Sequence, residues 1–377
     1  MVDFALTPKQ IEIQNQVADI AAGYCSEEQE RTADKTGDFQ EDVFQALAKC
    51  GLLTLWRGAA QGKGGMLDGC ILSEAMAKSS ASAASLVFVS GISAAIMERG
   101  GGPLADQLLS GLETGKLKFA FGLTESSAGS DVTALTTYAE NRNGSFIING
   151  AKRFTSGARE ADYILTVARS GDRDRKRPGL SIIAVPANSE GLTIEPLDKI
   201  SGNSHACCNL TFKDLVVSAE NLIGPEDNAW GILYMGGLIE RLSVAASAIG
   251  IAQRAYEETV SYLRQRQSAG RSVTDYQAIQ HQLVNMAMKL NAMRSTAYHA
   301  AWKADSGADA TADINMAKIF CVETGNQIIT DAFRLYGGTS YLNEATLYRL
   351  WRDSSLGFFA GGTVEIARNA AAKGLGL

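Results

Sequence analysis

Two adjacent charges, Glu240 and Arg241, interrupt a long apolar stretch at residues 231–252. The stretch has the pattern of a helix that is apolar on nearly every face. Neighbouring residues on a helix point about 100° apart, so these two charges cannot simply neutralise each other. A carboxylate buried there should have a raised pKa, which suits a general base that works near neutral pH. The alternative is a structural ion pair with a residue elsewhere in the chain.

A second candidate is the segment 119–132, where an apolar run enters a loop rich in glycine and small hydroxyl residues. Backbone N–H groups of this loop, together with the hydroxyls of Thr124 and Ser130, could bind the pyrimidine edge of a flavin or a pyrophosphate. Loops of this composition are also common as ordinary surface turns. Composition alone therefore leaves both interpretations open.

Two further segments could contact a ligand. Arg264 and Arg266 precede Gly270 near the end of an expected helix, where a guanidinium could bind a phosphate or could cap helix carbonyls. Gly361-Gly362, followed by Thr363 and Glu365, forms a glycine-rich break that would let the backbone approach a ligand closely. The same break is equally consistent with a plain connection between two helices.

Composition narrows the classes of function. Acidic residues outnumber basic ones by 41 to 35, and no basic block of the kind that neutralises a phosphate backbone is present, so nucleic acid is not an expected partner. The three histidines lack metal-ligand spacing, and we predict no metal site. No phosphate-binding glycine motif and no nucleophile triad stands out, which weakens hydrolase, phosphotransferase and nicotinamide-dependent interpretations.

Cysteine usage and the first residues indicate the compartment. The six cysteines include no CxxC pair, and the adjacent Cys207 and Cys208 can hardly be bridged to each other without strain, so we expect reduced thiols. No basic region followed by an apolar run opens the chain, and no signal peptide is expected. Glu240 and Arg241 make a membrane span over residues 231–252 unfavourable. We therefore expect a cytoplasmic protein with a buried helix at that position.

The elements that must position these residues change type twice along the chain. A helical pattern runs from Thr7-Pro8, a helix-start signal, to about residue 118. Short runs rich in β-branched and aromatic residues follow, to about residue 217. In this part Asn143-Gly144 is a turn signal and Asn149-Gly150 is a good two-residue hairpin signal.

Helices are expected again after Gly224-Pro225. The clearest amphipathic pattern is an apolar stripe at Leu283, Met286, Leu290, Met293 and Ala297. This order predicts an α+β fold with an N-terminal helical domain at residues 1–118, a middle antiparallel β domain at 119–225 and a C-terminal helical bundle at 226–377.

These segments, in this order and spacing, resemble the acyl-CoA dehydrogenase family over essentially the whole chain. The motifs that match are Leu123-Thr-Glu with Ala128-Gly-Ser-Asp131, Ile148-Asn-Gly-Ala-Lys152, Arg266 four residues before Gly270, Tyr336-Gly-Gly338, Arg352-Asp353 and Gly362-Thr363-Val-Glu365-Ile-Ala-Arg368. Within that family the C-terminal part resembles crotonobetainyl-CoA reductases and dehydrogenases that oxidise prolyl groups on carrier proteins. The stretches concerned are Met288-Lys-Leu-Asn, Ala300-Ala-Trp-Lys-Ala-Asp305, Trp351-Arg-Asp353 and the Cys207-Cys208 pair.

The resemblance implies a C-terminal four-helix bundle and FAD as the cofactor. Three groups of cofactor-contacting residues are implied. The first group is expected near the flavin ring or phosphates and comprises Phe121, Leu123, Thr124, Gly129, Ser130, Phe154 and Ser156. The second group is expected to reach the FAD of a neighbouring subunit and comprises Arg266, Arg334 and Gly338. The third group, Thr363 and Glu365 near the end of the chain, matches positions that contact FAD. Ser130 and Arg241 are implied as substrate-binding residues.

The resemblance also bears on the catalytic base. Many members carry a glutamate immediately before Gly-Thr, but this chain has Gly361 there. A minority, including isovaleryl-CoA dehydrogenases, place the base on a bundle helix directly before an arginine, and that position is Glu240. Glu240 is therefore the expected base, and the N–H of Gly361 is the expected donor to the substrate carbonyl oxygen.

The implied reaction is α,β-dehydrogenation of a short or branched acyl-CoA, with electrons passed to an electron-transfer flavoprotein by a homotetramer or homodimer. Three alternatives stay open. The chain could reduce an enoyl-CoA by the reverse reaction, or oxidise an acyl or aminoacyl group tethered to a carrier protein. It could also be a non-catalytic flavoprotein.

Overall fold

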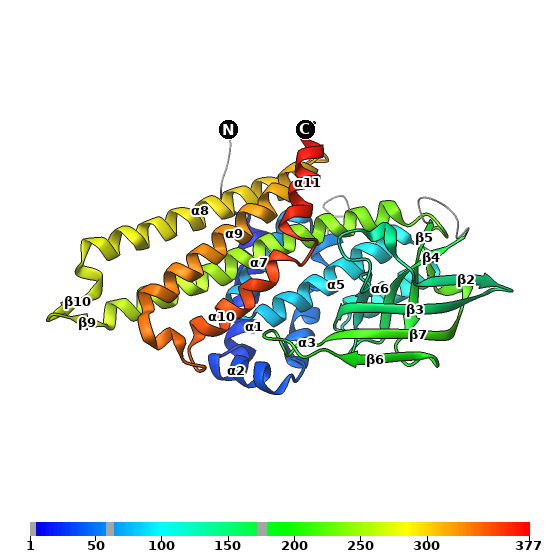
Figure 1. The fold of residues 1–377 in the computed structure, drawn as a ribbon, viewed down its shortest axis with the longest axis horizontal. Helices are drawn as coiled ribbons and strands as arrows, with labels where there is room; N and C mark the ends of the chain where they lie inside the picture. Colours follow the sequence, from blue (N-terminus) through cyan, green and yellow to red (C-terminus); the bar gives the residue numbers. More distant parts are fainter. Residues whose placement is uncertain (1–4, 58–63, 172–178) are drawn as a thin grey trace. The chain divides into compact units, whose positions relative to one another are not determined.

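The computed structural model describes residues 5–57, 64–171 and 179–377 (Figure 1). The chain forms two compact units. The first comprises the chain up to Asp34, Met66–Ala84 and Glu240–Leu377, and the second comprises Lys35–Gly65 and Ser85–Ile239. The predicted domain boundaries at 118/119 and 225/226 stay a prediction.

In the described part of the chain, helices alone precede the first strand of the sheet, as the pattern before residue 118 predicts. They are α1 (Pro8–Tyr24), α2 (Glu27–Thr36), α3 (Glu41–Lys49), α4 (Met66–Ser79), α5 (Ala81–Gly100) and α6 (Pro103–Glu113). The predicted helix start is confirmed, since the Thr7 hydroxyl accepts from the backbone N–H of Gln10 while the Gln10 side chain accepts from the backbone N–H of Thr7. This reciprocal pair is a capping box.

The predicted β-rich middle part forms one eight-stranded sheet. Its strands are β1 (Phe119–Gly122), β2 (Tyr138–Arg142), β3 (Ser145–Ser156), β4 (Tyr163–Ser170), β5 (Gly179–Pro186), β6 (Leu192–Pro196), β7 (Cys207–Ser218) and β8 (Leu222–Ile223). The spatial order is β6-β7-β3-β2-β4-β5-β8, and most neighbours are antiparallel, as predicted. Two pairings are parallel, that of β1 with β4 and a short one of β2 with β4. The sheet is held by a core that includes Phe146, Ile164 and Leu210.

Of the two predicted turns, the one at Asn143-Gly144 is confirmed and the hairpin turn at Asn149-Gly150 is wrong. Asn143 and Gly144 join β2 to β3 with positive φ values of 51° and 81°, the backbone that a tight hairpin needs. Asn149 and Gly150 instead lie inside β3, where the register with β7 shifts. Gly150 has φ 142°, and a Cβ there would come within 2.6 Å of the Thr137 Cα, so the glycine serves a β-bulge and a close approach of two backbones.

The C-terminal part is helical again. It contains α7 (Trp230–Gln265), α8 (Gln277–Asp305), α9 (Thr311–Tyr336), α10 (Thr346–Ser354) and α11 (Val364–Gly374), with a small hairpin of β9 (Gln267–Ser268) and β10 (Arg271–Ser272) between α7 and α8. Short 3₁₀ helices are η1 (Leu55–Arg57), η3 (Val132–Ala134), η4 (Ala219–Asn221), η5 (Val273–Asp275), η6 (Gly337–Tyr341) and η7 (Ser355–Phe358).

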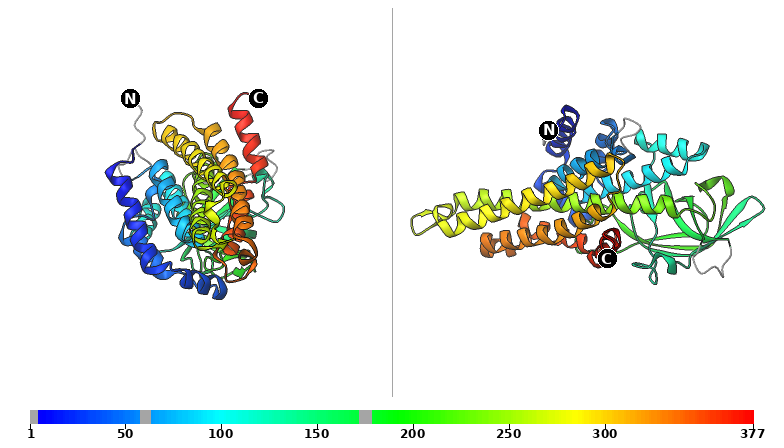
Figure 2. Two further views of the ribbon diagram at one scale, coloured as in Figure 1. Left: turned by 90° about the vertical axis from the view of Figure 1, so that its left-hand side faces the viewer. Right: turned by 90° about the horizontal axis from the view of Figure 1, so that it is seen from above.

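Helix α9 is the centre of this helical part. It packs along α8, and both α10 and α11 pack against it (Figures 1 and 2). The predicted apolar stripe on α8 faces inward, with Met286, Leu290, Met293 and Ala297 buried and Leu283 partly buried. The α+β fold, with a helical N-terminal part, a β middle part and a helical C-terminal part along the chain, is therefore confirmed.

Two of the described helices, α5 and α7, are long and apolar enough to cross a membrane by length and composition alone. In α5, 78% of the most apolar window is buried inside the protein, and in α7 the share is 50%. Core helices of soluble proteins pass the same test, and we interpret both helices in this way. Residues 231–252 lie in α7, so the prediction of a helix there is confirmed.

Candidate active site

Glu240 contacts a glycine turn that is distant in sequence. The backbone N–H of Gly361 donates to Oε1 of Glu240 at 3.0 Å. The next residue of α7, Arg241, donates from Nε to the Gly361 carbonyl at 3.1 Å. Glu240 and Arg241 thus contact the N–H and the carbonyl of the same residue. The predicted pair of catalytic residues, Glu240 and Gly361, lies together in this unit.

The turn itself depends on two glycines. Gly361 and Gly362 have φ values of 69° and 83°, in the left-handed region that disfavours other residues. A Cβ at position 361 would come within 3.1 Å of the Glu240 Cγ. A side chain at position 361 would therefore crowd the Glu240 side chain, and glycine leaves room for it.

Burial raises the pKa of Glu240 above the ordinary glutamate value. The charge of Arg241, the N–H of Gly361 and the charge of Lys318 act in the opposite direction and offset only part of this effect. The direction is the one that the isolated charge in an apolar helix predicts. A raised pKa makes this carboxylate a stronger base than an ordinary glutamate.

Lys318 is a functional candidate that sequence reasoning missed. It lies on α9 with 0% of its surface exposed, and its ammonium donates to the carbonyl of Gly362. Burial and the nearby charge of Arg241 lower the pKa of Lys318 to about 8. The available signal was its position as a lone basic residue inside the apolar run at residues 314–322.

In the other unit, the predicted cofactor-contacting residues Leu123 and Thr124, directly after β1, are hydrogen-bonded to β3. The backbone N–H of Arg153 donates to the Thr124 carbonyl at 2.8 Å, and the Lys152 ammonium donates to the Leu123 carbonyl at 3.0 Å. Phe154 follows directly, in a second register shift of β3. It has φ 58° and 58% of its surface is exposed. An exposed aromatic side chain held on a strained backbone is typical of ligand sites.

The same segments are held by a buried ion pair that sequence reasoning also missed. Lys152 and Glu125 lie 2.8 Å apart, with 0% and 4% of their side chains exposed. The Glu125 carboxylate also accepts from the backbone N–H groups of Thr136 and Thr137 and from the Thr136 hydroxyl. Burial alone would raise the pKa of Glu125, but the charge of Lys152 and these donors outweigh it and lower the pKa to about 2. The pair ties the loop after β1 to β3.

The remaining predicted contacts are spread over the surfaces of their own units. Partly buried members are Phe121 on β1 and Ser156 at the end of β3, while Gly129, Ser130, Gly338 and Glu365 are exposed. Thr363 is the N-cap of α11, where its hydroxyl accepts from the Ile366 N–H at 3.2 Å. Arg334 has 80% of its side chain exposed and lies 3.8 Å from Asp331.

Within its own chain, Arg266 makes the contacts expected of a residue that caps helix carbonyls. Its Nη1 donates to the Tyr336 carbonyl at 3.1 Å, in the last turn of α9, and to the Tyr262 hydroxyl at 3.1 Å. The residue is nevertheless exposed, so part of the guanidinium faces solvent. Contact of Arg266 with a cofactor of a neighbouring subunit stays a prediction.

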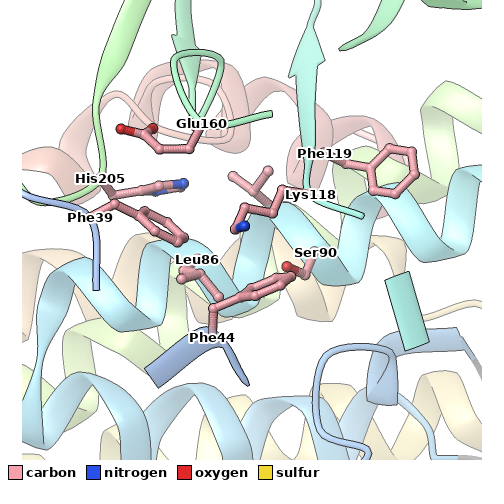
Figure 3. A pocket seen from close by; sticks show the side chains of 10 residues that line it. Phe39, Phe44, Leu86, Ser90, Lys118, Phe119, Glu160 and His205 are labelled. Atoms are coloured by element: carbon pink, nitrogen blue, oxygen red, sulfur yellow. The ribbon is translucent and has the colours of Figure 1, made fainter. Parts of the chain in front are cut away.

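The second unit also contains a small cavity (Figure 3). It has a volume of about 10 Å³ and includes His205, Glu160 and Lys118 in its lining. The ring of His205 is buried, its Nδ1 lies 2.9 Å from the Ser85 hydroxyl, and burial lowers its pKa to about 3. Burial thus disfavours the charged form of His205, and none of the predicted site residues lines this cavity.

Comparison with known proteins covers nearly the whole chain. Sequence models of the acyl-CoA dehydrogenase N-terminal, middle and C-terminal domains match residues 7–116, 120–215 and 234–376. Among curated proteins, a probable acyl-CoA dehydrogenase, YdiO, of Escherichia coli strain K12 is 31% identical, with 97% of this chain and 96% of that protein covered. A 3-(aryl)acrylate reductase of Clostridium sporogenes is also 31% identical, with 91% and 92% covered.

Solved structures agree. Butyryl-CoA dehydrogenase from Megasphaera elsdenii superposes with a TM-score of 0.94 at 26% identity, and both chains are covered completely. An FAD complex of PigA superposes with a TM-score of 0.92 at 26% identity, again with complete coverage. These similarities support a flavin cofactor and an oxidoreductase. The chain belongs to the acyl-CoA dehydrogenase family.

Proposed function

We propose that this chain is a soluble FAD-dependent dehydrogenase that oxidises the α,β-bond of a short or branched acyl thioester. The observation that carries the proposal is the partly buried Glu240 carboxylate, whose pKa is raised by burial and which faces the N–H of a left-handed glycine. The α-proton of a thioester is weakly acidic, so its removal needs a base that works near neutral pH and donors for the carbonyl oxygen.

In this proposal Glu240 takes the α-proton and Gly361 stabilises the negative charge that develops on the thioester oxygen. The Gly361 N–H donates to the Glu240 carboxylate in the structure. A carboxylate that gains a proton becomes a weaker acceptor. The transfer of the proton to Glu240 therefore releases the N–H for the substrate oxygen at the stage where the charge on that oxygen is largest. We assign Arg241 and Ser130 to substrate binding.

The residues present fit FAD. The exposed, left-handed Phe154 beside Leu123 and Thr124 has the character of a ligand surface. We assign Phe121, Leu123, Thr124, Gly129, Ser130, Phe154, Ser156, Thr363 and Glu365 to this cofactor, and Arg266, Arg334 and Gly338 to the cofactor of a neighbouring subunit in a homotetramer or homodimer. Bound FAD supplies the acceptor for the β-hydride. The chain's residues bind and orient it.

The test is anaerobic titration of the purified holoenzyme with short, branched and polar acyl-CoAs while the visible flavin band is followed, since the protein tunes the cofactor's chemistry but does not create it. Bleaching by one compound establishes dehydrogenation and names the substrate class. A flavin that stays oxidised with every acyl-CoA contradicts the proposed direction. Electron-transfer flavoprotein is the proposed acceptor, and re-oxidation of the reduced enzyme by that protein checks this assignment.

Specific relatives favour two other activities with the same residues. The 3-(aryl)acrylate reductase makes reduction of an enoyl substrate the second candidate, tested by oxidation of the dithionite-reduced enzyme with enoyl-CoAs. PigA, also solved with FAD and proline, favours an aminoacyl substrate, and oxidation of such a group on a carrier protein is the third candidate, tested with loaded carrier protein in the absence of CoA. A non-catalytic flavoprotein is the result if no thioester changes the flavin in either direction.

We expect Arg266→Ala to weaken FAD retention by about 1.5–3 kcal/mol, the value of a charge-assisted hydrogen bond. Flavin content after dilution and gel filtration measures this effect. Arg271→Ala is the matched control, because Arg271 is an exposed arginine of the hairpin that directly follows Arg266, and it lies over the Tyr276 ring. Equal flavin content in the two variants would remove Arg266 from the cofactor site and leave it as a cap of α9.

A further inference from the structure

Three backbone groups of the glycine turn are held by three charged side chains. Glu240 accepts from the Gly361 N–H, Arg241 donates to the Gly361 carbonyl, and Lys318 donates to the Gly362 carbonyl. The first two side chains come from α7 and the third comes from α9. Both carbonyls of the turn thus accept from basic side chains, next to the N–H that faces Glu240.

Lys318 is unusual among these three. Its side chain is fully buried, and no carboxylate of the described residues lies within 4.0 Å of its ammonium. A buried ammonium without an ion-pair partner costs stability, and a well-packed apolar side chain of similar length would cost less. The charge therefore needs an explanation other than stability.

The surroundings of Lys318 provide that explanation. Arg241, Glu240 and Glu365 are the charged groups that act on the Lys318 ammonium, and the charges that act on Glu240 are those of Arg241 and Lys318. Cations near a carboxylate favour its charged form and oppose the effect of burial. Lys318 also holds the glycine pair, whose backbone would otherwise be the most freely rotating part of the site.

We propose that Lys318 is a positioning residue for Glu240, which anchors the Gly361-Gly362 turn and keeps the carboxylate ready to accept a proton. The proposal rests on the assignment of Glu240 as the base. Lys318 touches neither substrate nor cofactor in this role and acts through the turn and through its charge. Two properties of the site follow from it, the orientation of one N–H donor and the pH range in which the base is charged.

The variants Lys318→Met and Lys318→Gln separate these two properties. Methionine has a similar length but neither charge nor donor, whereas glutamine keeps a donor for the Gly362 carbonyl and loses the charge. Both variants should move the acid limb of kcat/KM to higher pH, because removal of a cation raises the pKa of Glu240. Only Lys318→Met should also lose the hydrogen bond that holds the turn. Its kcat should fall by about 10–100-fold, with little change in KM.

Asn326→Leu is the matched structural control. Asn326 also lies on α9 and also donates to a carbonyl of a later segment, that of Ser354 at 3.3 Å, but it does not reach the glycine turn. We expect this variant to lower the melting temperature and to keep the wild-type pH profile. Lys318→Met should keep or raise the melting temperature at pH 7. In wild type, the folded-state pKa of Lys318 of about 8 lies below the free value of 10.5. The free-energy cost of burying this charge is therefore fully present below pH 8, and the methionine variant avoids it.

Infrared titration of the holoenzyme gives a measurement that does not depend on turnover. The carboxylic acid band lost in Glu240→Gln identifies Glu240, and its pH midpoint should lie higher in Lys318→Met than in wild type. An unchanged midpoint with unchanged kcat overturns the proposal, as does a loss of activity that only follows a loss of melting temperature. A shifted midpoint in an enzyme that no thioester reduces supports the positioning role and contradicts the proposed function instead.

Discussion

Glu240→Gln is expected to bind FAD normally and to lose turnover, with a fall in kcat of about 10²–10⁴-fold, the usual contribution of a positioned general base. Glutamine has nearly the same shape, and its amide oxygen can still accept from the Gly361 N–H. The glycine turn and the fold are therefore retained while the proton acceptor is removed. Stopped-flow reduction of the flavin by the acyl-CoA identified in the titration measures the chemical step directly.

Glu257→Gln is the matched control for this variant. Glu257 lies on the same helix, α7, and is exposed, where it pairs with Lys78 at 2.8 Å. This control should reduce the flavin at the wild-type rate. A wild-type rate in Glu240→Gln as well would remove Glu240 from the mechanism and would require a different base for this chain.

The pH dependence of the wild-type enzyme should agree with this assignment. Because burial raises the pKa of Glu240, the base is protonated over more of the acidic range than an ordinary glutamate. The rate of flavin reduction should fall as the pH is lowered through the pKa of Glu240, at a pH above the ordinary glutamate value of 4.5. In Glu240→Gln the residual rate should lack this limb.

The fold was predictable where local signals and the global fold agree. The capped start of α1, the apolar stripe of α8 and the turn at Asn143-Gly144 each follow from short-range patterns. The Asn149-Gly150 prediction failed because the same residue types also serve a bulge. Only the neighbouring backbone at Thr137, which no local pattern reports, distinguishes a bulge from a turn.

The candidate site was predictable only in part, for a similar reason. Glu240 stood out because a single carboxylate in an apolar helix is rare, but its contact with Gly361 joins residues 121 positions apart, and only the family resemblance connected them. Lys318 meets Gly362 across 44 positions, and Lys152 meets Glu125 across 27. Long-range pairs of this kind are set by how helices and strands pack, which residue spacing does not encode.

Glu125→Gln is expected to lower the free energy of unfolding by about 3–5 kcal/mol, because it leaves the ammonium of Lys152 buried without its partner. Urea unfolding at pH 7 measures this loss. The double variant Glu125→Gln with Lys152→Met removes both charges and should recover most of the stability. Glu257→Gln, which unpairs an exposed lysine, should change stability by only about 0–1 kcal/mol.

Acid should remove the contribution of Glu125 in wild type. The folded-state pKa of about 2 lies below the free value of 4.5, so the stabilisation is present above pH 4.5 and is lost as the pH falls toward 2. Glu125→Gln should lose less stability than wild type over that range. Equal stability of the two proteins at pH 7, or equal acid sensitivity, would mean that the buried pair contributes nothing net.

Glu125→Gln should also weaken FAD binding at the predicted cofactor surface. Lys152 donates to the Leu123 carbonyl as well as to Glu125, and the neighbouring Arg153 N–H donates to the Thr124 carbonyl. The ion pair lies beside the register shift of β3 between Lys152 and Thr155. If the pair sets the position of that bulge, the Glu125→Gln protein should release FAD faster than wild type at a pH where the variant is still folded. The double variant should regain stability without regaining FAD retention, because methionine cannot donate to the Leu123 carbonyl. Recovery of both would make the pair a purely structural feature of the sheet.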